Sequence, residues 1–419
     1  MKKISLITLA LAALAFCSCN EQKSVSTKYN DWLYGVEYED YDFEAATAAF
    51  SKYKPAAAGC SEVRKGNFIA RNLDWYINRQ VSGIVKVNGN GNRYASIGMA
   101  GCLPVYTIEF AQKTARDEET DTIYGIIPAT TVDGINEKGL YIGVNVVPTG
   151  ETSRDASKWN SGAWGLGAAF TNPDSDKTYC VTYLVRVVLD NAASVQEAIE
   201  LIKSINWYEP SGFPSAGESQ SFHWMVADAN SNAVLEFIDN QLEVIYVEGE
   251  QTKEPSFGTI MTNFNNTLYS EGMLQYKAAG VERYNILNAN YDAAEESVEG
   301  IKELIKKVWY TQAYSKDIDS EDFWCTEYVN GDFHAEAVYG NNANIENEAF
   351  RDLIKRGQAK FNDKANWHSD ESTLWYSTHT SVYDIEKRQL NVLVHEGLDG
   401  QQEWVCVDLN STFAKPLAQ

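Results

Sequence analysis

The sequence of 419 residues predicts an α+β fold in which strands and helices form separate layers. Strand-like runs dominate the first part of the chain, helices gather in the middle, and strands return at the end, an order typical of a layered α+β domain. Residues 60–419 contain no Pro/Ser-rich linker, so we expect them to form one large domain. A targeting segment (1–18) and a leader (19–59) precede this domain.

Residues 1–18 have the composition of a secretory signal. Lys2 and Lys3 precede the apolar run Ile4–Phe16, which is too short to span a membrane. The run ends in Phe16-Cys17-Ser18-Cys19, and a small residue just before Cys19 resembles a bacterial lipobox. We therefore expect loss of residues 1–18, a lipid on Cys19, and a bacterial lipoprotein anchored to a membrane in the periplasm or at the cell surface. A simple secreted protein cut nearby is the alternative.

The charge of the chain disfavours nucleic acid as a partner. Loss of Lys2 and Lys3 leaves 33 of the 35 basic side chains against 58 acidic ones, a net charge of −25. Binding to a phosphate backbone needs the opposite balance. No other apolar run approaches the ~20 residues of a membrane-spanning helix, so we expect membrane contact through the N-terminal lipid only.

The cysteine pattern favours a free thiol over a disulfide framework. An odd number of cysteines at wide spacings follows Cys19, and such a set does not resemble a disulfide scaffold. One unpaired thiol is what a cysteine nucleophile requires. These cysteines are Cys60, Cys102, Cys180, Cys325 and Cys406.

The leader, residues 19–59, is polar and contains several aromatic side chains. A helix is expected over Phe43–Tyr53, and Pro55 ends it. The leader has two compatible interpretations: a spacer that lifts the domain off the membrane, and a pro-segment that covers the site until cleavage. Because a spacer has little use for large aromatics, we expect five of them to pack onto the enzyme body: Trp32, Tyr38, Tyr41, Phe43 and Phe50.

Alternating and periodic apolar patterns predict the remaining elements. Strands are expected over residues 83–87, 104–110, 122–127, 139–147, 223–228, 233–238, 242–247 and 257–262, and as a closing pair over 377–385 and 389–395. Helices are expected over residues 179–189, 194–203, 281–288 and 298–309, the second opened by the capping box Ser194-Val-Gln-Glu197. The polar stretch 317–373 is interpreted as an insertion.

A small-residue run that ends at Gly59 precedes a thiol at Cys60. A cut at Gly59–Cys60 would make Cys60 an N-terminus whose α-amine, with a pKa of roughly 7.7–8.0, could act as the base for its own thiol. A turn at Lys65-Gly66-Asn67 predicts a hairpin that carries Arg71 and Asp74 back beside Cys60. Taken alone, a cysteine after Ala and Gly is also compatible with an ordinary buried thiol.

Five segments in this order resemble the choloylglycine hydrolase family, which includes conjugated bile-salt hydrolases and penicillin V acylases and is similar to acid ceramidases and N-acylethanolamine amidases. The resemblance runs from Cys60 to the final hairpin. The segments are Cys60-Ser with Arg71-Asn-Leu-Asp74, Asp133-Gly-Ile-Asn-Glu-Lys-Gly-Leu140 leading into Gly143-Val-Asn145, His223-Trp-Met-Val-Ala-Asp228, Thr262-Asn263, and Glu282-Arg283-Tyr284.

This resemblance implies a four-layer αββα N-terminal-nucleophile hydrolase fold that hydrolyses linear amide C–N bonds without a cofactor. Cys60 would be the nucleophile, Arg71 would hold its thiol toward thiolate, and Asp74 would orient the α-amine. The amides of Asn145 and Asn263 match the donors that stabilise the oxyanion. Arg283 matches the last charge of the family's site.

Each of these residues also has an ordinary structural interpretation. The two asparagines could be turn residues after strands, and the two arginines could form ion pairs at the surface. His223 and His379 are interpreted as core histidines. The histidine spacing gives no support for a catalytic metal.

The implied substrate is a small N-acyl amide with a bulky apolar acyl part, and a bile-salt conjugate is the leading case. Asn145 matches the bile-salt branch, where the penicillin V acylase branch tends to have Tyr. The leader and the short interval from Cys60 to Arg71 depart from the compact bile-salt enzymes. The alternatives within enzymology are a ceramidase-like or N-acylethanolamine amidase-like activity and a penicillin V acylase-like activity. The alternative from another class is a non-catalytic glycan-binding lipoprotein, suggested by 11 Trp and 24 Tyr. A homo-oligomer is left open.

Overall fold

The computed structural model of the chain describes residues 24–30, 33–50, 59–76, 81–103, 125–147, 153–155, 168–208, 221–273, 280–315, 325–329, 332–333, 372–394, 403–411 and 413. The signal segment 1–18, the proposed lipid site Cys19 and the expected strand 104–110 lie outside the described residues. Most of the expected insertion 317–373 lies outside them as well.

The first sheet contains nine strands, and its two outermost strands come from the leader. β2 pairs with β5 in parallel, and every other neighbouring pair is antiparallel. Its order is β1 (Ser24–Lys28), β2 (Leu33–Tyr38), β5 (Val81–Val87), β6 (Ser96–Leu103), β7 (Thr131–Asn136), β8 (Tyr141–Val147), β12 (Ser221–Ala227), β13 (Ser231–Ile238) and β14 (Gln241–Glu248).

The second large sheet also contains nine strands and carries the Cys60 hairpin next to its short edge strand β15. Its main path is β15 (Ile260–Met261), β3 (Gly59–Lys65), β4 (Phe68–Tyr76), β19 (Ser372–Asp384), β16 (Tyr310–Ser315), β17 (Cys325–Val329) and β18 (Asp332–Phe333). β20 (Gln389–Val394) pairs with both β19 and β21 (Val405–Asp408). A small third sheet joins β9 (Ala168–Phe170), β10 (Thr178–Cys180) and β11 (Asn206–Tyr208).

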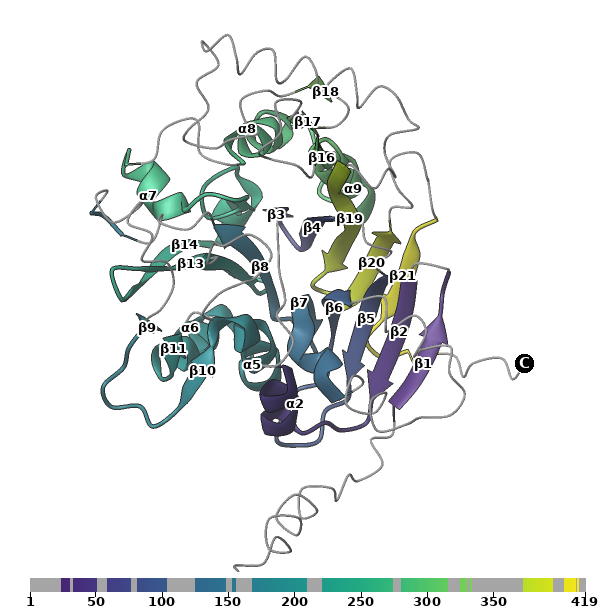
Figure 1. Ribbon diagram of the computed structural model, residues 1–419, viewed down its shortest axis with the longest axis vertical. Helices are drawn as coiled ribbons and strands as arrows, with labels where there is room; N and C mark the ends of the chain where they lie inside the picture. Colours follow the sequence, from purple (N-terminus) through teal and green to yellow (C-terminus); the bar gives the residue numbers. More distant parts are fainter. Residues whose placement is uncertain are drawn as a thin grey trace, which may run out of the picture.

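The buried apolar residues separate into layers. One core cluster packs α5 (Leu184–Asn191) and α6 (Val195–Lys203) on the outer face of the first sheet. A second lies between the two large sheets, and a third packs α7 (Asn266–Ser270), α8 (Val281–Asn290) and α9 (Val298–Lys306) on the outer face of the second sheet. Figure 1 shows α8 and α9 above the sheets and α5 and α6 below them. The four-layer αββα fold is therefore confirmed.

Helix ends follow local side-chain chemistry. Ser194 and Ser297 accept backbone N–H groups of Glu197 and Gly300, which caps α6 and α9. The expected capping box at Ser194 is only half right, because the Glu197 carboxylate accepts the N–H of Ala193 and not that of Ser194. The leader helix α2 (Phe43–Phe50) begins where it was expected.

Two expected strands are wrong. The described part of 122–127 is helical, and the 3-10 helix Ile127–Thr130 follows with Pro128 in its first turn, where the missing N–H costs nothing. Only Ile260–Met261 of the expected strand 257–262 pairs, because Thr259 bonds locally to Glu254 and Ser256 in a turn. Eleven of the described strands were not predicted: β1 and β2 of the leader, β6 and β7, the three strands of the small sheet, and β16, β17, β18 and β21 of the second sheet.

The expected helix 179–189 begins only at Leu184, after β10 and the 3-10 helix Val181–Tyr183, and α7 was not predicted. The other predicted strands and helices that fall on described residues agree with the structure, within shifts of a few residues at their ends. β17 and β18 show that part of the stretch 317–373 extends the second sheet; its interpretation as an insertion stays a prediction. None of the described helices is long and apolar enough to cross a membrane.

Candidate active site

The β3–β4 hairpin places the predicted nucleophile. The turn depends on Gly66, whose φ of 58° suits glycine. Antiparallel pairing sets Cys60 opposite Leu73 and Gly59 opposite Asp74. The hairpin predicted from the sequence is therefore confirmed, and it brings Arg71 and Asp74 to opposite faces of the sheet beside Cys60.

Arg71 lies on the sulfur side of Cys60 and reaches across to the first sheet. Its Nη2 atom lies 3.1 Å from Cys60 Sγ and donates to the carbonyl oxygen of Val144 at 2.6 Å. Its Nη1 atom forms an ion pair with Asp133 at 2.9 Å. All of these side-chain groups are buried. A single guanidinium therefore joins the thiol to both β7 and β8.

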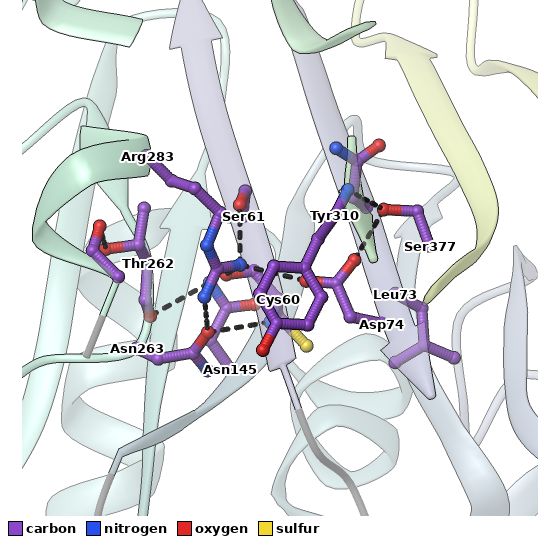
Figure 2. A network of polar contacts seen from close by, with 12 residues as sticks. Cys60, Ser61, Leu73, Asp74, Asn145, Thr262, Asn263, Arg283, Tyr310 and Ser377 are labelled. Carbon is purple, nitrogen blue, oxygen red and sulfur yellow. Dashed lines mark hydrogen bonds and ion pairs between the residues drawn. The ribbon is translucent and has the colours of Figure 1, made fainter. Parts of the chain in front are cut away.

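Arg283 of α8 holds the main chain of Cys60 from the other side (Figure 2). Its Nη1 atom donates to the carbonyl oxygen of Cys60 at 2.9 Å, to Ser61 Oγ at 3.0 Å and to Asp74 Oδ2 at 2.8 Å. Ser377 Oγ donates to the other oxygen of Asp74 at 2.6 Å. Asp74 is thus fixed by an arginine and a hydroxyl directly beside the Cys60 backbone.

Asn263 holds the nitrogen of Cys60. Its Oδ1 atom accepts the Cys60 N–H at 2.9 Å and also a hydrogen from Arg283. Because both neighbours are donors, only the amide oxygen can face them, which fixes the orientation of the side chain. Its Nδ2 atom then donates to the carbonyl oxygen of Val146 at 2.6 Å, so one of its two hydrogens is used there.

Asn145 lies in β8 and is fully buried. Its Nδ2 atom donates to the carbonyl oxygens of Met261 at 3.2 Å and Thr262 at 3.4 Å. These contacts tie the first sheet to the segment that carries Asn263. In this arrangement both hydrogens of the Asn145 amide are directed at main-chain oxygens.

The structure rejects two of the ordinary interpretations. Arg71 and Arg283 are 1% and 4% exposed, so neither is a surface residue. Asn145 lies within a strand and not in a turn. The interpretation of His223 as a core histidine is confirmed, because it is buried and its ring nitrogens contact the Glu236 carboxylate and the Thr262 carbonyl oxygen.

Burial dominates the titration of the thiol in the continuous chain. It raises the pKa of Cys60 to about 11, although the charge of Arg71 opposes the shift. Burial alone would lower the pKa of Arg71, but the neighbouring Cys60 and Asp133 raise it above its ordinary value. Arg71 therefore acts on the thiol in the expected direction, toward thiolate, but in the continuous chain burial outweighs it. Its role in the cut enzyme stays a prediction.

Several residues of the site were not identified from the sequence. Asp133 pairs with Arg71 and also accepts a hydrogen from the Tyr383 hydroxyl. Ser377 orients Asp74. Asp133 did carry a signal, since it opens a family motif; the strand residues Ser377 and Tyr383 carried none.

Glu62 is a buried carboxyl beside this network. It shares the face of Cys60 in β3 and pairs in register with Arg71. Its oxygens lie 2.7 and 2.8 Å from where a side chain on Gly143 would begin, so the absence of a side chain at Gly143 makes room for them. The Tyr141 hydroxyl lies at the same place. Burial raises the pKa of Glu62 to about 8, against the charge of Arg71 and a hydrogen bond from Tyr141.

No group of three or more His, Cys, Asp or Glu side chains in the described part of the chain is arranged to hold a metal ion. Cys60 and Cys406 form no disulfide. The chemistry available at the site is therefore that of a buried thiol, two arginines, a carboxylate and two amides.

Comparison with known proteins identifies the class. Residues 61–276, half of the chain, match a family described as linear amide C–N hydrolases, choloylglycine hydrolase family. The protein is thus a hydrolase of linear amide C–N bonds. It belongs to the choloylglycine hydrolase family, as its motifs predict.

Solved structures similar to this chain include penicillin V acylase from Agrobacterium tumefaciens, with a TM-score of 0.39, 15% identity, and coverage of 83% of this chain and 86% of that one. A variant of conjugated bile acid hydrolase from Clostridium perfringens has a TM-score of 0.43, 14% identity, and coverage of 86% and 99%. No curated protein sequence matches the chain. The four-layer assignment depends on the layers of this structure itself.

Glu62→Gln should change how stability depends on pH. The pKa of Glu62 is about 8 in the folded chain against 4.5 as the ordinary value, so the folded state binds this proton more tightly and loses stability as pH rises from about 4.5 to about 8. The variant lacks this loss. Its melting temperature minus that of the parent should increase across that window and level off above it. The corresponding change in the free energy of unfolding is at most about 5 kcal/mol.

Thermal denaturation at several pH values, with both chains in a Cys60→Ala background, measures this difference. Glu137→Gln is the matched control, because Glu137 is exposed. A difference that stays constant with pH would show that Glu62 does not titrate as described.

Proposed function

We propose that this protein is an N-acyl amide hydrolase whose nucleophile is Cys60, exposed as an N-terminus by self-cleavage at Gly59–Cys60. The observation that carries the proposal is the set of contacts around one residue. The Cys60 sulfur lies 3.1 Å from Arg71, its nitrogen contacts Asn263, and its carbonyl oxygen contacts Arg283. A merely structural cysteine has no need of charged or amide partners on all three groups.

In the continuous chain the nitrogen of Cys60 is an amide and cannot accept a proton near neutral pH. The thiol is also fully buried. The uncut chain is therefore an inactive precursor in this proposal. Hydrolysis of the Gly59–Cys60 bond consumes one water and yields a carboxylate at Gly59 and a free amine at Cys60.

The free amine would then serve as the base. Sγ attacks the carbonyl carbon of the substrate amide while the thiol proton passes to the α-amine, and the amine returns a proton to the leaving nitrogen as the C–N bond breaks. Water attacks the resulting thioester, which releases the carboxylate and regenerates the thiol. Asn263 already contacts the nitrogen that moves these protons, and Asp74 lies beside it.

Of the two asparagines, Asn263 is better placed to stabilise an oxyanion. Its Nδ2 atom donates to Val146 and has no second acceptor among the described residues, whereas Asn145 Nδ2 has two acceptors, the carbonyl oxygens of Met261 and Thr262. Asn145 could donate only after those contacts loosen. Both roles remain predictions.

For the substrate we propose a bile-salt conjugate. The match of Asn145 to the bile-salt branch of the family supports this choice. A penicillin V amide is the alternative, because the family also includes penicillin V acylases. We further propose that the enzyme is a membrane-anchored lipoprotein with its lipid on Cys19.

A hydrolysis panel tests the substrate class. Purified protein is incubated with tauro- and glyco-conjugated bile salts, N-acylethanolamines, ceramide and penicillin V, and release of the amine is measured. Fastest turnover is expected with a bile-salt conjugate and none with Cys60→Ala. Turnover confined to one of the other amides would contradict the proposed bile-salt substrate. Binding of glycans without any hydrolysis would contradict the assignment of the protein as an enzyme.

Cys60 should become the N-terminus of the active chain. Intact-mass analysis of active protein should show a chain that begins at Cys60, since only then does the α-amine exist. Cys60→Ala should remain uncut and inactive, and Cys60→Ser should be cut but slow, because a hydroxyl is a weaker nucleophile than a thiol. Full activity from a chain still joined to Gly59 would refute the mechanism.

Asn263→Ala should lower kcat by roughly 10²–10³ with little change in KM, because an oxyanion exists only near the transition state. Asn145→Ala should lower the melting temperature as well, since its amide ties β8 to Met261 and Thr262. Steady-state kinetics and thermal denaturation on cut protein separate the two effects. Parental turnover in the Asn263 variant would remove it from the oxyanion site.

A further inference from the structure

The leader does not lie on the enzyme as a loose extension; it forms an edge of the first sheet. β2 pairs in parallel with β5 over six residues, from Leu33 opposite Ser82 to Tyr38 opposite Val87, and β1 pairs outside it. Figure 1 shows β1 and β2 in purple at the edge of the sheet, beside β5. The proposed cut at Gly59–Cys60 falls between β2 and β5 in the chain, so it would not break this pairing.

Apolar side chains of the leader are part of the core. Leu33 is fully buried between the two large sheets. Val36, Tyr38, Tyr41 and Ala46 form a further core cluster with residues of β5, the 3-10 helix Ile127–Thr130 and the segment that precedes α5. The expectation that Tyr38 and Tyr41 pack onto the body is therefore confirmed.

The leader helix is held by aromatic and hydrogen-bond contacts. Phe43 packs edge-on against Tyr179 and Tyr183, with ring centroids 5.4 and 6.3 Å apart. The Tyr183 hydroxyl donates to the carbonyl oxygen of Thr47 at 2.9 Å. The side chains of Trp32 and Phe50, also expected to pack, lie outside the described residues.

Buried polar groups also cross the junction between leader and body. Lys86 of β5 pairs with Glu37 of β2 at 3.1 Å, and the N–H of Phe413 donates to the other Glu37 oxygen at 3.0 Å. The Tyr41 hydroxyl donates to Asp190 at the end of α5. Departure of the leader would leave Lys86 and Asp190 without these partners, which is costly for buried groups.

From these contacts we infer that the leader remains bound after cleavage as a small non-covalent subunit. This inference rests on the cut proposed above. The mature enzyme is then a complex of two chains, the leader 19–59 and the body 60–419. A lipid on Cys19 would hold the catalytic body at the membrane through these non-covalent contacts alone.

The inference is tested on the full chain, cut by itself and carrying a C-terminal tag. The body is purified through the tag and passed over a size-exclusion column in native buffer and in urea, and both fragments are identified by mass. Close to one leader per body is expected to co-elute in native buffer, and urea should separate them. A body that elutes alone in native buffer would overturn the inference.

Absence of the cut bears on the proposed function and not on this inference. If mass analysis finds only uncut chain, self-cleavage fails. Retention is then measured on a chain with a specific protease site inserted between Lys54 and Pro55 and cut after purification.

Two neighbouring positions of α2 provide a matched pair of variants. Ala46 is 2% exposed and lies in the core cluster, whereas Ala45 is exposed. Ala46→Asp places a charge in that core and should lower the leader recovered with cut body roughly tenfold or more, while Ala45→Asp should leave recovery unchanged. Equal recovery in both variants would contradict the contacts described; the unsubstituted protein gives an answer even if Ala46→Asp does not fold.

Discussion

The organisation of the site depends on one buried guanidinium. Arg71 leaves the second sheet, crosses the core and meets Asp133 and the Val144 carbonyl oxygen of the first sheet, with a nitrogen at the Cys60 sulfur. A buried charge is tolerated only when its donors are paired. The spacing of the two sheets at this point, the acid at position 133 and the lack of a side chain at Gly143, where the Glu62 carboxyl lies, therefore belong to one constraint. This constraint holds the thiol together with the hairpin.

The parts of the site that were predictable are those encoded within short segments. The turn at Gly66 implies the hairpin, and the hairpin implies that Arg71 and Asp74 lie beside Cys60. Capping serines likewise predict where α6 and α9 begin. By contrast, Ser377 bonds Asp74 from 303 residues away. Strand alternation predicts the face on which such a residue lies but not which strand lies opposite.

In the leader, too, the sequence predicted burial but not the strand partner. The aromatics indicated burial, but the strand Leu33-Tyr-Gly-Val-Glu-Tyr38 is short, and its parallel partner β5 lies beyond the proposed cut. Parallel pairing needs a long connection, and here that connection contains α2 and the catalytic hairpin. Cys60 therefore lies in the second sheet, while the segments before and after the hairpin pair with each other in the first sheet. Folding of the leader is thus coupled to placement of the nucleophile.

The placement of Cys60 within β3 would let the precursor become an enzyme without moving its nucleophile. The Cys60 main chain is held by Asn263 at its nitrogen and by Arg283 at its carbonyl oxygen, and neither contact involves Gly59. A cut before Cys60 would therefore leave the new N-terminus in place. Loss of one peptide bond would then create the α-amine that serves as the base, while the contacts that hold Cys60 to Asn263, Arg283 and Arg71 stay unchanged.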